Sequence, residues 1–382
     1  MVPSAAVRIG IDTHAAERGP SGNGSYIRGL VCALARLDHD IEYVLYALDA
    51  AHPFYAGFRG HPRVAVRRLW PRTALARIPL SLAAASYRDR LDALHVQYVG
   101  PPRHRGALVV TIHDLAFLRI PQSFPWGQAL RLRWQVRANA RRAAVVITGS
   151  EYSKQDIRDA YGTAESRIAV IPLAADSALA PVRDRSTIET LERELGIAHR
   201  YVLCVGRLNP RKNLIGLLRA FERVRPRLAD PVQLVIAGPR DYRADDLDRA
   251  IASSSCEKDV RRLGAVRHKD LSVLLSGAAV FAYPSFFEGF GLPLLEAMAC
   301  GTPVICSNVT SLREVVGDAA LTVDPSSPDD MAAAMLRVLG EPSVRARLVE
   351  RGLQRAAQFS WHSAAELTAG VYRRAVRGHR VA

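Results

Sequence analysis

The sequence lacks any uninterrupted apolar run of about 18 residues, the length that a membrane-spanning helix requires. The nearest candidate, residues 271–287, contains three serines and a proline, and it predicts the end of a helix followed by a strand. Residues 1–14 pass directly into a short apolar strand and show neither the basic region nor the cleavage site of a signal peptide. We therefore expect no transmembrane segment and no secretory leader.

Cysteine is also scarce, with five residues that form no C-x-x-C pair. They lie mostly in apolar surroundings, where a reduced thiol behaves as a small core residue. This pattern argues against a structural zinc site and against a disulfide framework. We expect a reducing environment, and hence a cytoplasmic protein.

Negative charge is in deficit, because 37 Asp and Glu face 52 Lys and Arg and leave a net charge of +15. The excess is mostly arginine. Such a charge attracts phosphates, nucleic acid or an anionic membrane face. No stretch combines clustered cations with a recognised nucleic-acid motif, so we predict no nucleic-acid partner.

Short apolar runs predict strands in two series, which fit the 49% of hydrophobic residues expected of a packed chain. The first series lies at 7–12, 42–48, 108–114, 144–150 and 168–173, and the second at 201–207, 232–238, 260–266, 280–285 and 302–307. Periodic segments at 26–37, 153–162, 213–229 and 292–300 predict helices between them. The alternation favours an α/β protein with parallel sheets covered by helices.

A polar stretch at 174–197 separates the two series and predicts a domain boundary near 180–198. Two domains also fit 382 residues at about 100 to 200 residues per domain. We expect one domain at 1–182 and a second at 198–360. Residues 361–382 predict a terminal helix that either caps the second domain or crosses back to the first.

Two glutamates eight positions apart, Glu288 and Glu296, flank a glycine-rich turn and the start of a predicted helix. Gly289 and Gly291 allow a tight turn, and Pro293 fits the first helical turn. Free N–H groups at a helix start attract phosphate, while a carboxylate on either side suits sugar hydroxyls. The arrangement fits a nucleotide sugar; on spacing alone, a solvated helix residue and a turn residue are equally good interpretations.

Arg207 and Lys212 follow the predicted strand 201–207 and Gly206, just before a helix that begins near Asn213. Arginine can bind phosphate oxygens through two donors, and lysine supplies a compact charge for a leaving diphosphate. Taken alone, both could be ordinary surface cations. Their position at a strand end beside the glutamates favours the phosphate interpretation.

The first domain offers two further candidates. A loop with Gly19, Gly22 and Gly24 follows the first strand, but Ile27 stands where a nicotinamide-cofactor motif G-x-G-x-x-G needs its third glycine. His113 follows the strand at 108–114, where a lone histidine is more often structural than a substrate ligand. The D-x-D at 246–248 lies in what looks like an exposed helix start, so we predict no catalytic metal.

Together these segments resemble the retaining glycosyltransferases of family 4. The resemblance covers nearly the whole chain and rests on SGNGSYIRGL, TIHDLAF, VGRLNPRKN, VIAGPRD and above all EGFGLPLLEAMACGTPVICSN, which contains the E-x7-E pattern of that family. It implies the GT-B fold, in which two Rossmann-like, doubly wound domains face a central cleft. The implied activity is transfer of a hexose from a nucleotide sugar.

The resemblance also implies roles for individual residues. The catalytic residues would be Arg207 and Lys212, which contact the diphosphate, Glu288, which contacts the donor sugar, and His113, which faces that sugar. Donor-binding positions would be Gly22, Gly24, Gly206, Gly289, Phe290, Gly291, Leu292, Pro293, Leu294 and Glu296, with Glu296 on the ribose. The family's usual reaction is a same-face substitution, and no metal or other cofactor is implied.

Within the family, RIGIDTH and HDLAFLRIPQSFPW resemble bacterial mannosyltransferases that build O-antigen and related polysaccharides. That favours GDP-mannose as donor and leaves a UDP-hexose open. The acceptor would be a glycan or a lipid-linked glycan. An epimerase of the same architecture and a non-catalytic nucleotide-sugar-binding subunit are the alternative functions.

Residues 63–90 mix arginines with Trp70, Leu75, Ile78 and Leu80. Such a segment could rest on an anionic lipid surface. We predict transient docking to the inner face of the plasma membrane. An ordinary basic helix and loop is the competing interpretation.

Overall fold

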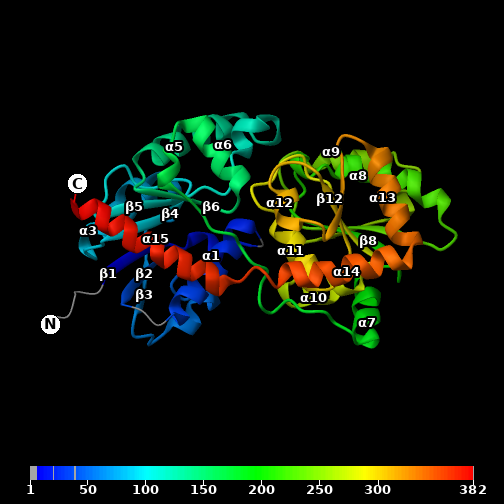
Figure 1. Cartoon of the computed structure of the whole chain (residues 1–382), viewed down its shortest axis with the longest axis horizontal. Coiled ribbons are helices and arrows are strands. Elements are labelled where there is room, and N and C mark those ends of the chain that lie inside the picture. The colour runs from blue at the N-terminus through cyan, green and yellow to red at the C-terminus, as the bar shows by residue number, and fades with distance from the viewer. Residues whose placement is uncertain (1–6, 20, 38–39, 382) are drawn as a thin grey trace. The chain divides into compact units, whose positions relative to one another are not determined.

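A computed structural model describes residues 7–19, 21–37 and 40–381 of the chain. Residues 1–6, on which part of the expectation about a leader rests, lie outside the described residues. The chain forms two compact units (Figure 1). The first unit contains Met1–Leu115, Gly127–Leu173 and Ser360–Ala382, and the second contains Ala116–Trp126 and Ala174–Phe359.

These bounds differ from the predicted domains at two places. The first unit ends its main run at Leu173 rather than at 182, and residues 116–126 belong to the second unit. The amide of Asn209 donates a 3.0 Å hydrogen bond to the carbonyl of Ser123, which ties this excursion to the second unit. The composition of residues 116–126 does not show that they belong to the second unit, because contacts between segments far apart in sequence decide this.

The first unit has a parallel sheet of seven strands in the order β3-β2-β1-β4-β5-β6-β7. Its strands are β1 (Val7–Asp12), β2 (Ile41–Ala47), β3 (Val64–Arg68), β4 (Ala93–Gln97), β5 (Ala107–Thr111), β6 (Val145–Thr148) and β7 (Ile168–Val170). Its α-helices are α1 (Gly22–Arg36), α2 (Ala74–Ala76), α3 (Ala83–Arg88), α5 (Trp126–Arg142), α6 (Glu151–Tyr161) and α15 (Trp361–Val381). Chain order reverses between β1 and β4, so the sheet has its topological switch point there.

The second unit has a parallel sheet of six strands in the order β10-β9-β8-β11-β12-β13. Its strands are β8 (Tyr201–Val205), β9 (Gln233–Ala237), β10 (Val260–Gly264), β11 (Val280–Tyr283), β12 (Val304–Ser307) and β13 (Ala320–Val323). Its α-helices are α4 (Ala116–Arg119), α7 (Arg185–Leu195), α8 (Leu214–Val224), α9 (Ala244–Ala252), α10 (His268–Gly277), α11 (Leu292–Ala299), α12 (Leu312–Val316), α13 (Pro328–Gly340) and α14 (Pro342–Ala356).

The two parallel α/β sheets confirm the predicted fold class, and all ten predicted strands are present. Three strands were not predicted: β3, β4 and β13. Each has only four or five residues, and β4 carries His95 and Gln97 among its apolar residues. Runs this short and mixed do not stand out from loops when only the pattern is used.

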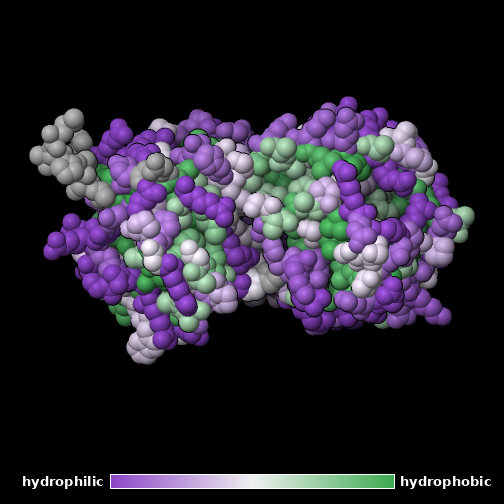
Figure 2. Space-filling view, turned by 90° about the horizontal axis from the view of Figure 1, so that it is seen from below, coloured by the Kyte–Doolittle hydropathy of each residue, from purple (hydrophilic) through white to green (hydrophobic). Residues whose placement is uncertain are grey.

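The core of the second unit shows how the helical spacing is used. α8 places Leu217, Leu218 and Phe221 at helical intervals, and all three are buried against the sheet and α13. In Figure 2, hydrophilic residues cover most of the surface that the view shows of each unit. Over the described residues, no helix combines the length and the apolar character needed to span a bilayer.

The terminal helix α15 belongs to the first unit, where it packs on α1 (Figure 1). Tyr372 on α15 hydrogen-bonds His95 of β4 at 2.7 Å, and Arg373 pairs with Asp40. Gly29 on α1 leaves the room in which Trp361 packs, since a Cβ there would lie 2.2 Å from the indole ring. The sequence left two placements open for this helix. Its contacts correspond to the one in which it crosses back to the first unit.

Candidate active site

Charged side chains meet at the carboxyl ends of β8 and β11, the central strands of the second unit. Lys212 lies in the 3-10 turn Pro210–Lys212 after β8, and its Nζ is 2.6 Å from Oε1 of Glu288. Nζ of Lys212 also donates a short hydrogen bond to the hydroxyl of Tyr283, the last residue of β11. Arg211 pairs with the other carboxylate oxygen of Glu288 at 2.7 Å. Lys212, Tyr283 and Glu288 are all buried.

Lys212 is the one buried lysine among the four in the sequence, all of which the structure describes. Burial lowers its pKa, and Glu288 offsets this only in part. Burial by itself would raise the pKa of Glu288, but Arg211 and Lys212 outweigh burial and bring that pKa down to about 2. Glu288 is therefore ionised at neutral pH, and two cations share one carboxylate.

Hydrogen-bonding capacity remains in this cluster. An ammonium group has three N–H donors, and Nζ of Lys212 uses two of them on Tyr283 and Glu288. Each carboxylate oxygen of Glu288 accepts one bond from a cation and can accept another. One lysine donor can therefore reach an anionic oxygen while Glu288 accepts from a hydroxyl.

The turn between the two glutamates is fixed from both sides. Arg211 donates to the carbonyl of Phe287, and its own carbonyl accepts from the amide of Phe286. Ser311 donates to the carbonyl of Glu288 at 2.9 Å. Gly291 caps α11 with a φ of +102°, where a Cβ would lie 2.7 Å from Leu312. The start of α11 is thus held rigidly beside the charged cluster, as an anion site requires.

The predicted site residues of the second unit lie at the same edge but not in one cluster. Arg207 is exposed, and its nearest recorded acid is Asp241 at 3.7 Å, so it does not share the contacts of Glu288. Glu296 is partly buried one turn into α11. Gly206 follows β8, and a Cβ added there would lie 3.5 Å from the aliphatic stem of Lys212. Phe290, Leu292 and Leu294 are buried and Pro293 is half-buried.

Sequence reasoning missed Arg211 and Tyr283. Arg211 directly precedes Lys212, and the adjacent pair of cations was a usable signal for a site that has to hold more than one negative group. The pattern predicted Tyr283 as a buried residue at the end of a strand. Nothing in it indicated that the hydroxyl of this tyrosine would contact a charged group.

In the first unit, the glycine loop expected before the helix is only partly a loop. Gly22 and Gly24 are in the first turn of α1, which begins after the N-cap Ser21. The hydroxyl of Ser21 accepts from the amide of Gly24 at 3.2 Å. A Cβ at Gly24 would lie 2.8 Å from the carbonyl of Ala15, so this glycine is required for close packing. The spacing could not distinguish a packing glycine from a flexible one.

His113 lies two residues after β5, at the carboxyl edge of its sheet, as the sequence predicted. Its Nε2 is 2.8 Å from Oε1 of Gln97, and the ring of Tyr26 packs edge-on at 4.7 Å. Burial lowers the pKa of His113 to about 4, so the ring is neutral at neutral pH. With Nε2–H donating to the amide oxygen, Nδ1 carries the lone pair.

The D-x-D at 246–248 is in α9, near its first turn. Asp246 pairs with Arg243 and Arg249, while Asp248 pairs with Arg240 and Arg262. Both carboxylates are therefore engaged by arginines, of which only Arg249 lies on α9 itself. Across the described ranges, no group of three or more His, Cys, Asp or Glu side chains is placed to hold a metal ion.

Two parallel α/β units, with a phosphate-attracting helix start and a cation–carboxylate cluster at the strand ends of one, define a glycosyltransferase of the GT-B architecture. Family models agree. Residues 20–179 match Glycosyltransferase Family 4, and residues 188–355 match Glycosyl transferases group 1. The chain belongs to glycosyltransferase family 4, and it is a hexosyltransferase.

Two relatives and one solved structure illustrate the likeness. The chain is 35% identical to the O-antigen chain mannosyltransferase B of Escherichia coli over 76% of each chain. It is 27% identical to the MMP alpha-(1->4)-mannosyltransferase of Mycolicibacterium hassiacum over 97% of this chain and 98% of that one. Anabaena HepE, solved in complex with UDP-glucose, superposes with a TM-score of 0.73 at 21% identity over 95% and 98% of the two chains.

Proposed function

We propose that this glycosyltransferase moves mannose from GDP-mannose to a glycan or lipid-linked acceptor in polysaccharide synthesis. The observation that carries the proposal is the cluster of Arg211, Lys212 and Glu288 beside the start of α11. Two cations and a helix start suit a diphosphate, and an ionised carboxylate with spare acceptor sites suits a sugar. Mannose as the sugar is supported by the names of both relatives described above.

In this proposal different residues contact different parts of the nucleotide sugar. Glu288 accepts hydrogen bonds from hydroxyls of the hexose, and Glu296 does so from the ribose. Lys212 uses its third N–H on the diphosphate, and Arg207 reaches the same group from the exposed side of the strand end. Within residues 291–294, the backbone N–H groups of Gly291 and Leu292 complete the phosphate contacts, because Pro293 has no N–H and that of Leu294 donates to the carbonyl of Gly291. Gly206, Gly289 and Phe290 shape the approach.

We propose that the transfer retains the anomeric configuration through a same-face substitution. Both glutamates of the E-x7-E pattern have binding roles, and Glu288 is already shared by two cations. The leaving phosphate would then help to deprotonate the acceptor hydroxyl. Because Lys212 and Arg207 neutralise the leaving group in this scheme, the reaction needs no resident cofactor or metal.

The donor is tested by thermal shift with GDP, UDP, ADP and their hexose conjugates. A ligand present at 100 times its Kd adds about 2.7 kcal/mol to the free energy of unfolding. We expect GDP and GDP-mannose to raise the melting temperature most. A larger shift with UDP and a UDP-hexose would contradict the GDP-mannose proposal and favour the UDP-hexose alternative.

The activity is tested by incubating GDP-mannose with the protein, with and without a mannose-terminated acceptor. We expect a transfer product only when the acceptor is present. Rapid formation of an epimeric nucleotide sugar from donor alone would favour the epimerase alternative. Donor binding without either product would favour a non-catalytic subunit.

We also propose that residues 63–90 dock transiently on anionic lipid. The segment contains β3 and an uninterrupted helical run over residues 74–88. Trp70, Leu75 and Leu80 are 75%, 77% and 67% exposed. Exposed cations at Arg67, Arg68 and Arg72 accompany them. Apolar side chains among cations match an anionic interface. One arginine of this segment, Arg77, is buried and does not belong to this surface.

Liposome sedimentation tests the docking, with and without an anionic phospholipid. We expect binding only to the anionic vesicles and a marked loss in the double variant Leu75→Ser/Leu80→Ser. Leu367→Ser, which changes an exposed leucine on α15, is the matched control. Equal sedimentation of wild type and double variant would remove this segment from the proposal.

A further inference from the structure

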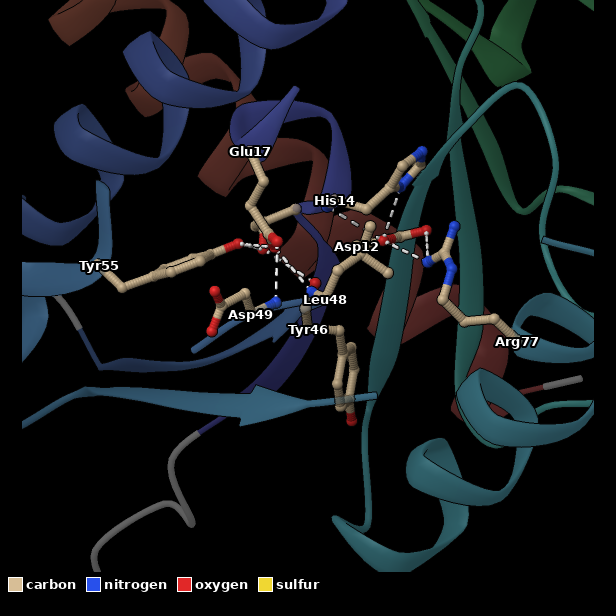
Figure 3. Close-up of polar contacts among 9 residues, drawn as sticks. Asp12, His14, Glu17, Tyr46, Leu48, Asp49, Tyr55 and Arg77 are labelled. Carbon is tan, nitrogen blue, oxygen red and sulfur yellow. Dashed lines mark hydrogen bonds and ion pairs between the residues drawn. The ribbon is translucent and has the colours of Figure 1, made fainter. Parts of the chain in front are cut away.

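A second polar cluster lies at the carboxyl end of β1 in the first unit (Figure 3). Asp12, the last residue of β1, is buried and accepts from Nη1 of Arg77 with both carboxylate oxygens at 3.0 Å. Its Oδ1 is also 2.9 Å from Nδ1 of His14. The three side chains thus form an arginine–carboxylate–imidazole chain.

The cluster occupies the place where doubly wound sheets bind ligands. Chain order reverses between β1 and β4, and such switch points open a crevice outside the carboxyl ends of the two strands. His14 begins the 3-10 turn His14–Glu17 that directly follows β1. Gln97 ends β4 on the other side of the switch point, and His113 follows the next strand.

The turn that carries His14 is held rigidly. Glu17 accepts from the amides of Leu48 and Asp49 at 2.7 and 2.8 Å and from the hydroxyl of Tyr55 at 2.8 Å. Thr13 bonds both Tyr55 and the carbonyl of Tyr46. A side chain on such a turn keeps its direction without a bound ligand, which is the condition for a preorganised contact.

The hydrogen bonds also fix which nitrogen of His14 is available. Burial by itself would raise the pKa of Asp12, but His14 and Arg77 outweigh burial and hold it well below its usual range. An ionised carboxylate only accepts, so Nδ1 of His14 must be the donor to Asp12, and the tautomer with its proton on Nδ1 has its lone pair on Nε2. Figure 3 shows Nε2 on the side of the ring away from Asp12. The side chain is 21% exposed.

Arg77 is buried beside Asp12 with one of its N–H groups unsatisfied by the described residues. Its side chain is only 2% exposed, and its buried Nε finds no hydrogen-bond partner among the described residues. A buried guanidinium is stabilised by its pairing with Asp12, yet an unsatisfied N–H beside that pair costs free energy unless water or a ligand atom meets it.

The charge of the cluster distinguishes its ligand from the donor. Asp12 and Arg77 cancel, and His14 offers a hydrogen-bond acceptor, so there is no surplus cation for a diphosphate. A neutral hydroxyl is the group that such an imidazole binds. We propose that Nε2 of His14, oriented by Asp12 and Arg77, accepts a hydrogen bond from a hydroxyl of the glycan acceptor; this rests on the proposed transfer of mannose to a glycan.

Substitutions of His14 by asparagine and by glutamine separate its two nitrogens. An asparagine side chain at this position can still donate to Asp12 but has no atom in place of Nε2, whereas a glutamine can place an amide oxygen near it. We expect His14→Asn to raise the acceptor KM by about 2- to 10-fold, the effect of one lost hydrogen bond, with kcat and the Kd of GDP-mannose unchanged. His14→Gln should recover part of the loss.

An unchanged acceptor KM in His14→Asn would overturn the assignment. So would a fall in kcat of more than about 100-fold at constant KM, because that is the effect of losing a general base. If wild type transfers no sugar, the proposed function fails and this inference falls with it. A normal wild type with an unaffected His14→Asn variant makes this inference alone fail.

A binding measurement supplies a readout besides activity. In protein labelled with ¹⁵N-histidine, we expect long-range imidazole spectra to show His14 protonated on Nδ1. Adding methyl α-mannoside, as a hydroxyl-bearing probe of a mannose-terminated acceptor, should shift its Nε2 signal. A proton on Nε2 in the free protein, or no shift at saturating probe, would contradict the proposal.

Discussion

The two units carry different kinds of polar cluster at the same place in their sheets. In the second unit, Arg211 and Lys212 surround Glu288 and leave one positive charge in excess. In the first, Arg77 and Asp12 cancel, and Asp12 orients the imidazole of His14. The excess charge suits the diphosphate of a donor, and the neutral cluster suits a hydroxyl. Charge balance at the strand ends thus distinguishes the ligands of two sheets that are otherwise built alike.

The largest expected effect comes from separating the pair in the first unit. Asp12→Ala leaves Arg77 buried without its carboxylate, and breaking a buried pair in this way costs about 3–5 kcal/mol in free energy of unfolding. Denaturant unfolding measures the loss. Glu42→Ala, which breaks the half-exposed pair with Arg8, is the control and should cost less than about 1 kcal/mol.

The double variant Asp12→Ala/Arg77→Met sharpens this test. If the pair acts as a unit, the double variant should be less destabilised than the sum of the two single variants, because neither charge is left alone. Simple additivity would show that the buried pair is not what holds the carboxyl end of β1.

The next effect tests the excess charge of the second unit. Lys212→Ala removes a donor to the developing charge on the leaving diphosphate, and such a loss lowers kcat by about 100- to 1,000-fold. Steady-state transfer assays measure it, with circular dichroism to verify the fold. Lys269→Ala, at an exposed lysine, is the control. Full activity of Lys212→Ala would refute the assigned role.

A third effect tests the ion pairs of Glu288 by pH. The pKa of Glu288 lies at about 2 in the folded protein and near 4.5 ordinarily, so its contribution is complete above pH 4.5 and is lost as pH falls toward 2. The difference corresponds to roughly 3 kcal/mol. As pH is lowered through this range, the free energy of unfolding should fall less steeply in Glu288→Gln than in wild type. Glu296→Gln serves as the comparison, and an identical slope in Glu288→Gln would contradict the ion-pair account.

The smallest effect concerns a neutral network in the first unit. Tyr372→Phe removes the hydrogen bond to His95, whose pKa burial lowers to about 3, so an uncharged pair is lost. We expect a loss of about 1 kcal/mol in free energy of unfolding. Leu367→Ala on the same helix should be nearly neutral. A loss of several kcal/mol in Tyr372→Phe would show that α15 contributes more than packing and this one bond.

Much of the fold was predictable because its strands are apolar runs. Tyr201 to Cys204 and Val280 to Tyr283 are buried on both faces of a parallel sheet, and burial of this kind leaves a clear pattern. β13 and β4 were missed because a strand of four or five mixed residues leaves almost no hydrophobic pattern in the sequence. The terminal helix was predicted, but its unit was not, since that depends on Tyr372 meeting a strand 277 residues away in sequence.

For the candidate site, the sequence located the glutamates, Lys212 and His113 at strand ends but could not pair them. Arg77 looked like one more surface arginine of a basic segment, because its partner Asp12 lies 65 positions earlier. The sequence pointed to Arg207 and missed Arg211, although Arg207 is exposed and Arg211 is the arginine that contacts Glu288. Local patterns report which residues are near a strand end, whereas the contacts depend on how distant segments pack.

The return of α15 to the first unit has a consequence for synthesis on the ribosome. Tyr372 and Val376 belong to the core of a unit whose sheet begins at Val7, so that core lacks a helix until nearly the whole chain has emerged. The usual order, in which an N-terminal domain folds first, does not hold here. The second unit, which is complete at Phe359, can finish folding while the unit that precedes it still waits for its last helix.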